Sequence, residues 1–426
     1  MATFFNFSFC VTTLFLPIIV LTLVIIHLLT LNLYQTAMAQ QQPILNDPNL
    51  QAEIYVEGFS WPTIMAFIDN NNILVLEKEK GTVRLVTDGI LQEEPVLEVD
   101  VNSKIERGLL GIAIMNKYTV FLYYTESSQS EDNELLKNRV YEYQWNEEEK
   151  ILVNPTLILD LPAIPGPNHD GGKLTIGPDN YLYTVIGDLN HEGKLQNILD
   201  GPQPDDTGVI FRVNPENGSP APDNPFADKE NNRYYAYGIR NSFGIDFDPI
   251  TGNLWDTENG PEYGDEINLV KPGFNSGWKQ VMGPISKTNV NEDELIRFPG
   301  SHYADPVFSW IPSIGITDIE FLNSSKLGNK YANNIFVGDI GDLTDGYLYY
   351  FEVNKDRTGI DFGSNREIGL TDLIADNEEE MSVIALGTAF GGITDIETGP
   401  DGFLYILTLD RESDGEGKIY RITLSQ

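Results

Sequence analysis

The chain has very little cysteine and no charge at its start. Its single cysteine, Cys10, falls within the first 39 residues, and these contain no Asp, Glu, Lys or Arg. The sequence from residue 40 onward therefore has no disulfide, no thiolate nucleophile and no zinc–thiolate site. Any core that it forms must be stable without covalent cross-links.

The uncharged start of the chain is predicted to be a targeting segment. Residues 9–33 are nearly continuous apolar sequence, and Ala37-Met38-Ala39 resembles a cleavage site. We interpret residues 1–39 as a secretory signal peptide or, because the apolar run is close to a membrane span in length, as an N-terminal membrane anchor. In both cases the domain of residues 40–426 is expected to be extracellular or at the cell surface.

Basic residues are scarce relative to acidic ones. The sequence has 64 Asp and Glu against 27 Lys and Arg, and the net charge of −37 belongs entirely to residues 40–426. A field of this sign repels phosphate backbones, so we expect no nucleic-acid partner. The excess of carboxylates has two interpretations, which are solubility in a salty exterior and ligation of Ca²⁺, an ion that prefers hard oxygen ligands.

No long amphipathic helix is indicated in the domain, and short alternating segments separated by turn residues run through it instead. One unit recurs, a strand, a turn of Asp, Asn, Pro or Gly, and a second strand with aromatic or branched residues. Its six copies lie at 66–75, 112–123, around 178–179, and at 246–255, 319–337 and 399–405. Each copy is followed by a candidate outer strand, at 81–85, 139–143, 208–213, 266–270, 346–351 and 417–422.

These repeats predict an all-β fold, a six-bladed β-propeller whose blades carry unequal insertions. A pair of β-sandwiches is the alternative, but it would not require the unit to recur. In a propeller the loops at one end of the blades converge on the axis, so residues distant in sequence can share a central pocket.

Histidine is also rare. Only His169, His191 and His302 follow the first 39 residues, which limits the candidates for a base near neutral pH. His169 stands in the turn Asn168-His169-Asp170-Gly171-Gly172, just before an alternating segment. Small neighbours leave room above a side chain presented at the start of a strand, so His169 is the candidate base. We expect the other two histidines to be structural or to lie outside the first contacts of a ligand.

Two later stretches carry groups suited to a ligand oxygen and to a metal ion. Arg240 and Asn241 provide a fixed cation and an amide, although an ordinary surface arginine paired with a carboxylate is the alternative. The stretch from residue 257 to 268 joins the carbonyls of Gly260-Pro261 to carboxylates, a combination that suits Ca²⁺. Its spacing matches no EF-hand.

A series of short motifs, in a fixed order along the chain, carries a resemblance to a known family. The motifs are Trp61-Pro62, Glu106-Arg107-Gly108-Leu109-Leu110-Gly111-Ile112-Ala113, Asn168-His169-Asp170-Gly171-Gly172, Gly177-Pro178-Asp179, Tyr237-Gly238-Ile239-Arg240-Asn241, Glu258-Asn259-Gly260-Pro261, Asp265-Glu266-Ile267-Asn268, Asn275-Ser276-Gly277-Trp278 and Pro312-Ser313-Ile314. Together they resemble the soluble PQQ-dependent glucose and aldose sugar dehydrogenases over nearly all of residues 40–426. That family is a six-bladed propeller.

The resemblance implies roles for the residues around the substrate. His169 is the base that takes the proton of the anomeric hydroxyl while hydride passes to PQQ. Arg240 stabilises the negative charge that develops on the reduced quinone. Asn241 contacts the cofactor, Glu106 stands near cofactor and sugar where the family has a glutamine, and Asn168 lies near the sugar.

The resemblance also implies two metal positions. The main-chain carbonyls of Gly260 and Pro261 bind a Ca²⁺ that polarises PQQ. Glu266, together with the carbonyl of Ser276, matches a second and structural Ca²⁺ site.

This sequence departs from the family at basic positions. Two arginines that grip the cofactor are absent from Gly391-Gly392-Ile393-Thr394-Asp395, and a lysine is absent from Gly338-Asp339-Ile340-Gly341. PQQ carries three carboxylates, and a charge-assisted hydrogen bond is worth about 1.5–3 kcal/mol. The missing cations are therefore expected to weaken cofactor binding.

Three functions remain open at this point. The first is oxidation of an aldose sugar to its lactone with PQQ and Ca²⁺, the electrons passing to an external acceptor. The second is a Ca²⁺-binding propeller that binds carbohydrate or protein without redox chemistry, and the third is a Ca²⁺-dependent lactonase. The retained His169, Arg240 and Gly260-Pro261 favour the first function, whereas the missing cations favour the second.

Overall fold

The computed structural model describes residues 42–127, 136–226, 231–341, 346–363, 369–411 and 413–425. Contacts divide the chain into the units Met1–Pro43 and Ile44–Gln426. The signal or anchor predicted at residues 1–39 lies outside the described residues. Within the described ranges, no helix has both the length and the apolar character that a membrane span requires.

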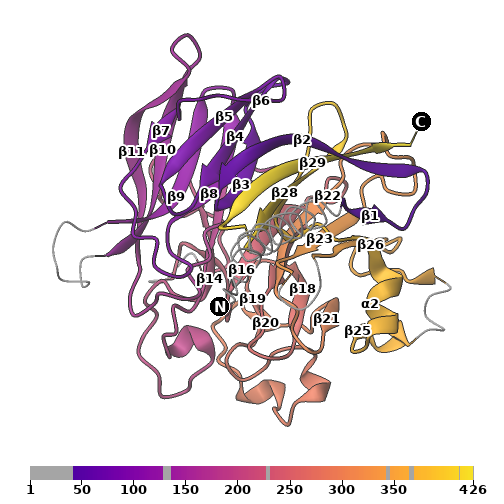
Figure 1. Ribbon diagram of the computed structural model, residues 1–426. Coiled ribbons are helices and arrows are strands. Elements are labelled where there is room, and N and C mark those ends of the chain that lie inside the picture. Colours follow the sequence, from indigo (N-terminus) through magenta and orange to yellow (C-terminus); the bar gives the residue numbers. More distant parts are fainter. Residues whose placement is uncertain are drawn as a thin grey trace, which may run out of the picture. The chain divides into compact units, whose positions relative to one another are not determined.

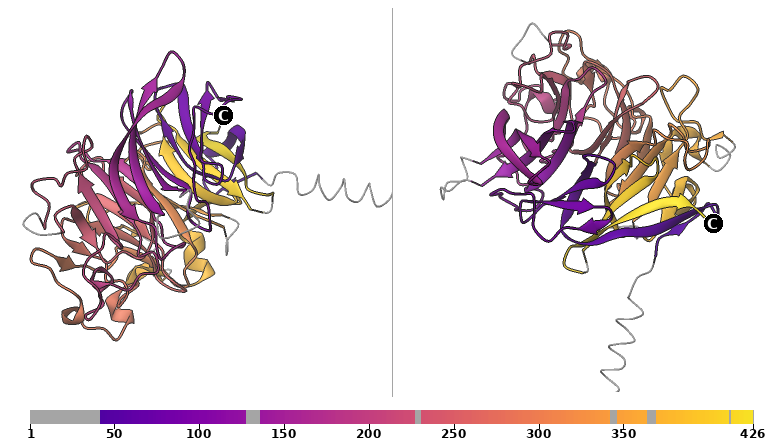
Figure 2. Two further views of the ribbon diagram at one scale, coloured as in Figure 1. Left: turned by 90° about the vertical axis from the view of Figure 1, so that its left-hand side faces the viewer. Right: turned by 90° about the horizontal axis from the view of Figure 1, so that it is seen from above.

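Six sheets make up the second unit, and each contributes one inner strand to a closed ring (Figures 1 and 2). Each inner strand contacts the inner strand before it and the one after it, and the last contacts the first. The inner strands are β3 (Pro62–Phe67), β8 (Leu109–Asn116), β12 (Leu174–Ile176), β16 (Ser242–Phe247), β22 (Ile316–Phe321) and β27 (Gly392–Thr398). The predicted all-β six-bladed β-propeller is confirmed.

Each predicted strand–turn–strand unit corresponds to the inner strand and the first middle strand of a blade, and each candidate outer strand is the second middle strand, with further strands outside it. The two middle strands of each blade pair antiparallel with one another. In chain order they are β4 (Asn72–Glu77) and β5 (Thr82–Thr87), β9 (Thr119–Glu126) and β10 (Lys137–Asn146), β13 (Leu182–Ile186) and β14 (Val209–Val213), β17 (Leu254–Glu258) and β18 (Asp265–Val270), β23 (Ile335–Asp339) and β24 (Leu348–Phe351), and β28 (Leu404–Asp410) and β29 (Glu416–Leu424).

The remaining strands lie outside the inner and middle strands, and the helices lie between strands. The strands are β1 (Ile44–Leu45), β6 (Ile90–Leu91), β7 (Leu97–Glu98), β11 (Ile151–Pro162), β15 (Tyr234–Tyr237), β19 (Phe274–Asn275), β20 (His302–Tyr303), β21 (Phe308–Trp310), β25 (Ile374–Ala375) and β26 (Ala385–Thr388). The helices are α2 (Glu378–Ile384) and the 3₁₀ turns η2 (Lys194–Gln196), η3 (Ile285–Lys287), η4 (Glu292–Glu294) and η6 (Leu370–Asp372). Asn377 caps α2 by accepting a hydrogen bond from the N–H of Glu380.

The ring is closed by a strand from the other end of the domain. β2 (Leu50–Ser60) pairs antiparallel with β29, from Leu50 opposite Leu424 to Ser60 opposite Glu416. Figure 1 shows this as the indigo strand β2 running beside the yellow strand β29. The last blade therefore takes its outer strand from the start of the domain, which covers a sheet edge and fastens both ends without a disulfide.

Aromatic side chains fill the space between neighbouring sheets. Trp255 of β17 and Trp310 of β21 are fully buried, and the ring of Trp255 meets that of Phe321 in the neighbouring sheet edge to face with centroids 5.8 Å apart. Burial of a large apolar side chain contributes about 1.5–3 kcal/mol. This packing between blades replaces the cross-links that the sequence lacks.

Carboxylates on the inner strands also connect each of the later blades to the next. An inner strand is a sheet edge, so its N–H groups on that side have no partner strand. A carboxylate of the preceding blade accepts a hydrogen bond from such an N–H group in each of these cases: Phe321 N to Asp246 Oδ2 (2.8 Å), Ile396 N to Asp318 Oδ2 (3.0 Å), Thr398 N to Glu320 Oε1 (2.9 Å) and Met65 N to Asp395 Oδ2 (2.9 Å). We call the four acceptors, Asp246, Asp318, Glu320 and Asp395, the axial carboxylates.

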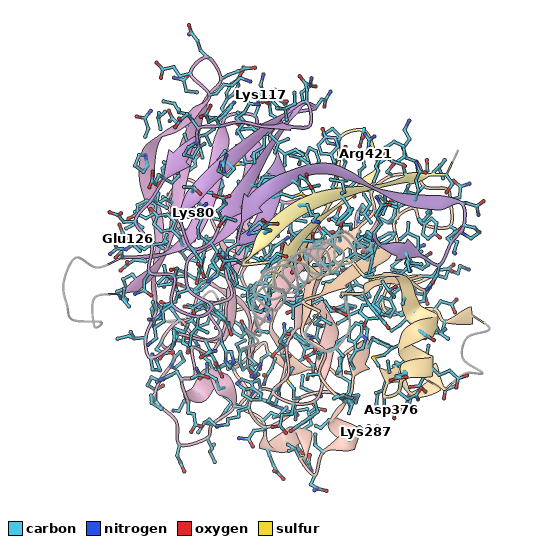
Figure 3. All side chains as sticks on the ribbon, viewed as in Figure 1. Lys80, Lys117, Glu126, Lys287, Asp376 and Arg421 are labelled. Atoms are coloured by element: carbon cyan, nitrogen blue, oxygen red, sulfur yellow. The ribbon has the colours of Figure 1, made fainter. Side chains whose placement is uncertain are left out.

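Ion pairs at the outer surface are a different use of charge. Lys117 pairs with Glu147, and Arg421 pairs with Glu53. Figure 3 shows Lys117 and Arg421 at the edge of the domain, where water screens them. Such pairs contribute about 0–1 kcal/mol each. The stability of the propeller therefore depends on burial and on the axial bonds.

Candidate active site

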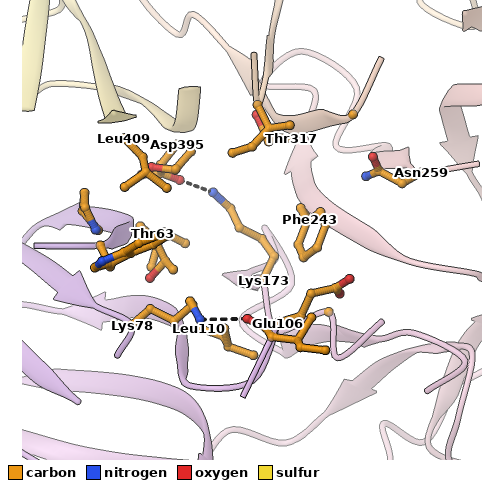
Figure 4. Close-up of a pocket in the computed structure, with 18 of the residues that line it drawn as sticks. Thr63, Lys78, Glu106, Leu110, Lys173, Phe243, Asn259, Thr317, Asp395 and Leu409 are labelled. Atoms are coloured by element: carbon orange, nitrogen blue, oxygen red, sulfur yellow. Dashed lines mark hydrogen bonds and ion pairs between the residues drawn. The ribbon is translucent and has the colours of Figure 1, made fainter. Parts of the chain in front are cut away.

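A cavity of about 600 Å³ lies on the axis, and all six blades contribute to its wall. Its apolar side chains include Leu110, Phe243 and Leu409, and Figure 4 shows them around Lys173, which extends from the blade 3 loop toward Asp395. Convergence of all blades on one cavity is what the sequence analysis expected of a propeller.

Lys173 neutralises part of the axial charge. Its Nζ lies 2.8 Å from Asp318 Oδ1 and 2.7 Å from Asp395 Oδ1, and all three side chains are buried. Burial opposes the charge of the lysine, but the two carboxylates outweigh it and hold the pKa of Lys173 well above its ordinary value. The lysine therefore stays charged and joins the sheets of β12, β22 and β27 beside the cavity.

His169 has a fixed orientation. Its φ is 64°, a left-handed conformation that few residues other than glycine adopt, and its side chain is buried. Nδ1 lies 2.6 Å from Asp188 Oδ1, and Asp188 Oδ2 accepts a hydrogen bond of 2.6 Å from Trp278 Nε1. A neutral ring that donates from Nδ1 presents a lone pair on Nε2, which is the arrangement that a general base requires.

Gly187 lets the segments of His169 and Arg240 meet. A Cβ atom at Gly187 would clash with the main-chain carbonyls of both residues. The next residue, Asp188, donates its N–H to the carbonyl of Arg240 at 2.9 Å. The turn after β13 therefore holds the histidine on one side and the arginine on the other.

Glu106 joins the other residues that the sequence predicted near the substrate. Its Oε2 accepts hydrogen bonds from His169 N at 2.7 Å and from Asn241 Nδ2 at 3.0 Å, and its Oε1 accepts one from Asn168 Nδ2 at 3.4 Å. Glu106 also lines the cavity. The structure thus brings Glu106, Asn168, His169 and Asn241 into one cluster, which reaches the cavity wall through Glu106.

Arg240 is half-buried and held from three sides. Its N–H donates to Glu258 Oε1 at 2.6 Å, its Nη1 donates to Asn259 O at 2.8 Å, and its guanidinium lies 5.4 Å from the centre of the Trp278 ring. Burial lowers the pKa of Arg240, and the charge of Asp188 opposes that change. An arginine remains protonated under these conditions and presents a fixed positive charge.

Two buried polar atoms at this place have no partner within the described part of the chain. They are Nε of Arg240 and Oδ1 of Asn241. A buried polar atom without a partner costs about 1–3 kcal/mol, so a ligand that pairs with both atoms is favoured. One donor and one acceptor fit a cofactor with carbonyl and ring N–H groups, such as PQQ.

The predicted metal ligands Gly260 and Pro261 lie on a tight turn. The N–H of Gly260 donates to Asp265 Oδ1 at 2.8 Å, and a Cβ at Gly260 would clash with the carbonyl of Tyr263. Among the described residues, no main-chain N–H donates to the carbonyls of Gly260 and Pro261. Both oxygens therefore fit as ligands of a hard cation.

At the second predicted metal position, Glu266 and Ser276 lie close together beside Glu258. Ser276 donates its hydroxyl to Glu258 Oε2 at 2.5 Å, and Glu266 Oε2 lies 3.5 Å from the same hydroxyl. Burial raises the pKa of Glu258 to about 7. Asp256 beside them is fully buried, and in the described ranges neither of its carboxylate oxygens has a hydrogen-bond partner.

These orphaned oxygens fit a cation, but side chains alone do not form its cage. In the parts of the chain that are described, no group of three His, Cys, Asp or Glu side chains has the geometry to hold a metal ion. A Ca²⁺ at either position would need main-chain or amide oxygens as well, which Ca²⁺ accepts readily.

The cations at the cavity wall differ from those of the resembling family. Ile340 and Thr394 line the wall in the two stretches where the family's basic residues were expected, and Lys78, Lys173 and Arg411 line it elsewhere. Nζ of Lys78 donates to the carbonyls of Ile105 at 2.9 Å and Arg107 at 3.3 Å, which fixes the loop that carries Glu106. Sequence reasoning did not identify any of these three cations.

Sequence reasoning also missed Asp188 and Trp278 as partners in the site. Asp188 carries a local signal, since it follows Gly187 on the turn that leaves the hairpin beginning at His169. Trp278 lies in a motif that was recognised, but its contact with Asp188 spans 90 positions and has no local signal. The other histidines have separate contacts, His191 with Asp205 and His302 with the ring of Phe274.

Comparisons with known proteins find similar sequences over most of the chain. The family described as Glucose / Sorbosone dehydrogenase matches residues 59–421. The aldose sugar dehydrogenase YliI of Escherichia coli K12 is 27% identical over 374 residues, which cover 86% of this chain and 91% of the relative.

Solved structures agree with the fold. An oxidoreductase (glucose dehydrogenase) of Thermus thermophilus is 27% identical with a TM-score of 0.66 and covers 88% of this chain and 99% of its own. The PQQ-bound aldose sugar dehydrogenase of Streptomyces coelicolor is 21% identical with a TM-score of 0.63, covering 88% of this chain and 99% of its own, and at that identity it supports the fold alone.

Proposed function

The chain belongs to the glucose/sorbosone dehydrogenase family, and on that premise we propose that it oxidises an aldose at the anomeric carbon to the lactone. The cofactor in this proposal is PQQ with Ca²⁺, and an external acceptor takes the electrons. The predicted targeting segment supports an extracellular or cell-surface location, with the segment either removed or kept as a membrane anchor.

The pair of His169 and Asp188 carries the proposal. With Nδ1 bound to Asp188, Nε2 of His169 accepts the proton of the anomeric hydroxyl, and Asp188 stabilises the imidazolium that results. Glu106 and Asn168 lie beside His169 and are placed to bind the sugar hydroxyls. The hydroxyl proton thus goes to His169 as the C1 hydrogen leaves with two electrons, and C1 becomes a carbonyl.

A bound cofactor would accept the two electrons that leave C1 with its hydrogen. Bound PQQ supplies an acceptor for hydride from C1. Arg240 donates to an oxygen on which negative charge develops, and its unpaired Nε and the unpaired Oδ1 of Asn241 fit the polar edge of such a ring. The carbonyls of Gly260 and Pro261 would hold its Ca²⁺, with Glu266 and Ser276 near a second ion.

One observation favours a second candidate function. Thr394 and Ile340 line the cavity in the two stretches where the family's cations were expected, and Lys173 is already paired with two carboxylates. A propeller that keeps the architecture and Ca²⁺ but binds carbohydrate or protein without redox chemistry accounts for this charge pattern.

A titration distinguishes the two functions. Purified protein in excess Ca²⁺ is titrated with PQQ while the absorbance of the cofactor is followed, and a panel of aldoses is then added. Saturable binding followed by sugar-dependent bleaching supports the dehydrogenase. Absence of binding at high micromolar PQQ would leave the non-redox propeller. Arg240→Gln serves as the matched variant, because it is expected to weaken PQQ binding and to lower the rate by about 10²–10³-fold.

A further inference from the structure

One side chain touches both halves of the candidate site. The indole N–H of Trp278 donates to Asp188 Oδ2 at 2.6 Å, and the face of the same ring lies under the guanidinium of Arg240 at 5.4 Å. Asp188 in turn binds Nδ1 of His169. Trp278 is therefore in direct contact with the partner of the proposed base and with the proposed electrostatic catalyst.

The main chain around Trp278 is anchored on both sides. Its N–H donates to the carbonyl of Gly238 at 3.1 Å, and its own carbonyl accepts a hydrogen bond of 2.7 Å from Asn197 Nδ2. At Gly277 a Cβ would lie 2.9 Å from Val281, so the preceding position has no room for a side chain. The main chain that carries the indole is thus fixed. From this position the ring contacts the side chains of Asp188 and Arg240.

Asp188 depends on this indole for its orientation. Its Oδ1 already accepts hydrogen bonds from His169 Nδ1 at 2.6 Å and from Asn190 N at 2.7 Å. Its Oδ2 accepts the indole N–H, and the side chain is only 4% exposed. Without that N–H the buried Oδ2 loses its partner, and rotation of the carboxylate to recover one breaks the bond to His169.

We propose that Trp278 is a positioning residue that couples the base His169 to Arg240, using its N–H for the first and its ring face for the second. The inference rests on the proposed function, because it assigns the same two residues. It adds that their geometry is set together, so that a change in the ring affects both proton transfer and charge stabilisation.

Two substitutions separate the two contacts. Trp278→Phe keeps a ring face for Arg240 and removes the N–H, so kcat is expected to fall about 10- to 100-fold with little change in cofactor affinity. Trp278→Gln keeps an N–H donor and removes the ring face, so cofactor affinity is expected to fall more than kcat. Trp145→Phe is the matched control, since the buried Nε1 of Trp145 has no partner among the described residues.

A second measurement needs neither cofactor nor sugar. The chain has five tryptophans, so the indole N–H signals in a ¹⁵N-labelled sample are few, and Trp278→Phe identifies one of them. That signal is expected to move in His169→Gln, which changes the partner of Asp188 Oδ1, and to stay in place in His191→Gln. An indole signal of Trp278 that His169→Gln leaves unmoved overturns the coupling, as does a Trp278→Phe protein that keeps kcat within twofold of Trp145→Phe.

The two proposals can fail separately. A protein that oxidises no aldose and binds no PQQ overturns the proposed function. The indole signal still tests the coupling in that protein, because the bonds between Trp278, Asp188 and His169 do not depend on a bound ligand.

Discussion

Asp395 on the axis and Asp188 in the candidate site are both buried carboxylates, but they accept hydrogen bonds from different kinds of donor. Asp246 and Asp395 accept hydrogen bonds from main-chain N–H groups of the next blade. Asp188 and Glu106 accept theirs largely from the side chains of His169, Trp278 and Asn241. A carboxylate bonded to the backbone fixes one blade against another, whereas one bonded to a ring or amide fixes groups that can react.

The largest expected effect is at the candidate site. His169→Ala is expected to lower sugar oxidation by about 10²–10⁴-fold, because a general base contributes that much, with thermal stability almost unchanged. Dye-linked oxidation and a melting curve check both parts. His191→Gln is the control, since His191 pairs with Asp205 and is expected to leave the rate unchanged. An active His169→Ala protein would remove this histidine as the base.

The second largest effect is expected on the axis, and it is a loss of stability instead of a loss of activity. Lys173→Met leaves Asp318 and Asp395 buried without their cation, which is expected to cost about 3–5 kcal/mol of unfolding free energy. Urea denaturation measures this loss. Lys117→Met removes an exposed pair that water screens, and it is expected to leave the unfolding free energy almost unchanged. Equal losses in the two variants would show that the axial pair has no special role.

A pH series is expected to show the cost of axial burial. Burial raises the pKa of Asp246 to about 7, so the folded state binds a proton that the unfolded state releases. This contribution to stability is complete below about pH 4 and is lost as pH rises through about 7. Unfolding free energies from urea titrations at several pH values are expected to fall by roughly 1–3 kcal/mol over this window. Asp246→Asn is expected to flatten the slope, and an unchanged slope would exclude Asp246 as its source.

The smallest effect is expected from removing Ca²⁺. An ion bound by the folded state at ten times its Kd adds about 1.4 kcal/mol, so chelation is expected to lower Tm by a few degrees. Ca²⁺ is expected to restore the original value, and Mg²⁺, which demands shorter and more regular coordination, is not. A Tm that is indifferent to the chelator would count against Ca²⁺ at both predicted positions.

The sequence predicted the blades well because their signal is local. Each inner hairpin combines alternation with a turn of Asp, Asn, Pro or Gly, as at Pro178-Asp179 between β12 and β13. The pairing of β2 with β29 was not predicted. Its partners are more than 350 positions apart, and the sequence of one strand does not indicate which strand it pairs with. The family resemblance, which depends on motif order, is confirmed by the match over residues 59–421.

The candidate site was predicted in part for the same reason. His169, Arg240 and Asn241 stand just before inner strands, where glycines mark the turns. The contacts that orient them come from Asp188, Glu258 and Trp278, and these depend on how the blades pack. The roles of the predicted residues remain predictions, although the structure brings them together.

The pairing between β2 and β29, which we call the seam, also determines when the ring can close during synthesis. β2 is among the first parts of the domain to be synthesised and β29 is the last, so the ring cannot close before translation of the domain is complete. Early blades can form hairpins, but the last blade keeps an open edge until then. A chain with this seam therefore keeps its last blade incomplete until its final strand has been made.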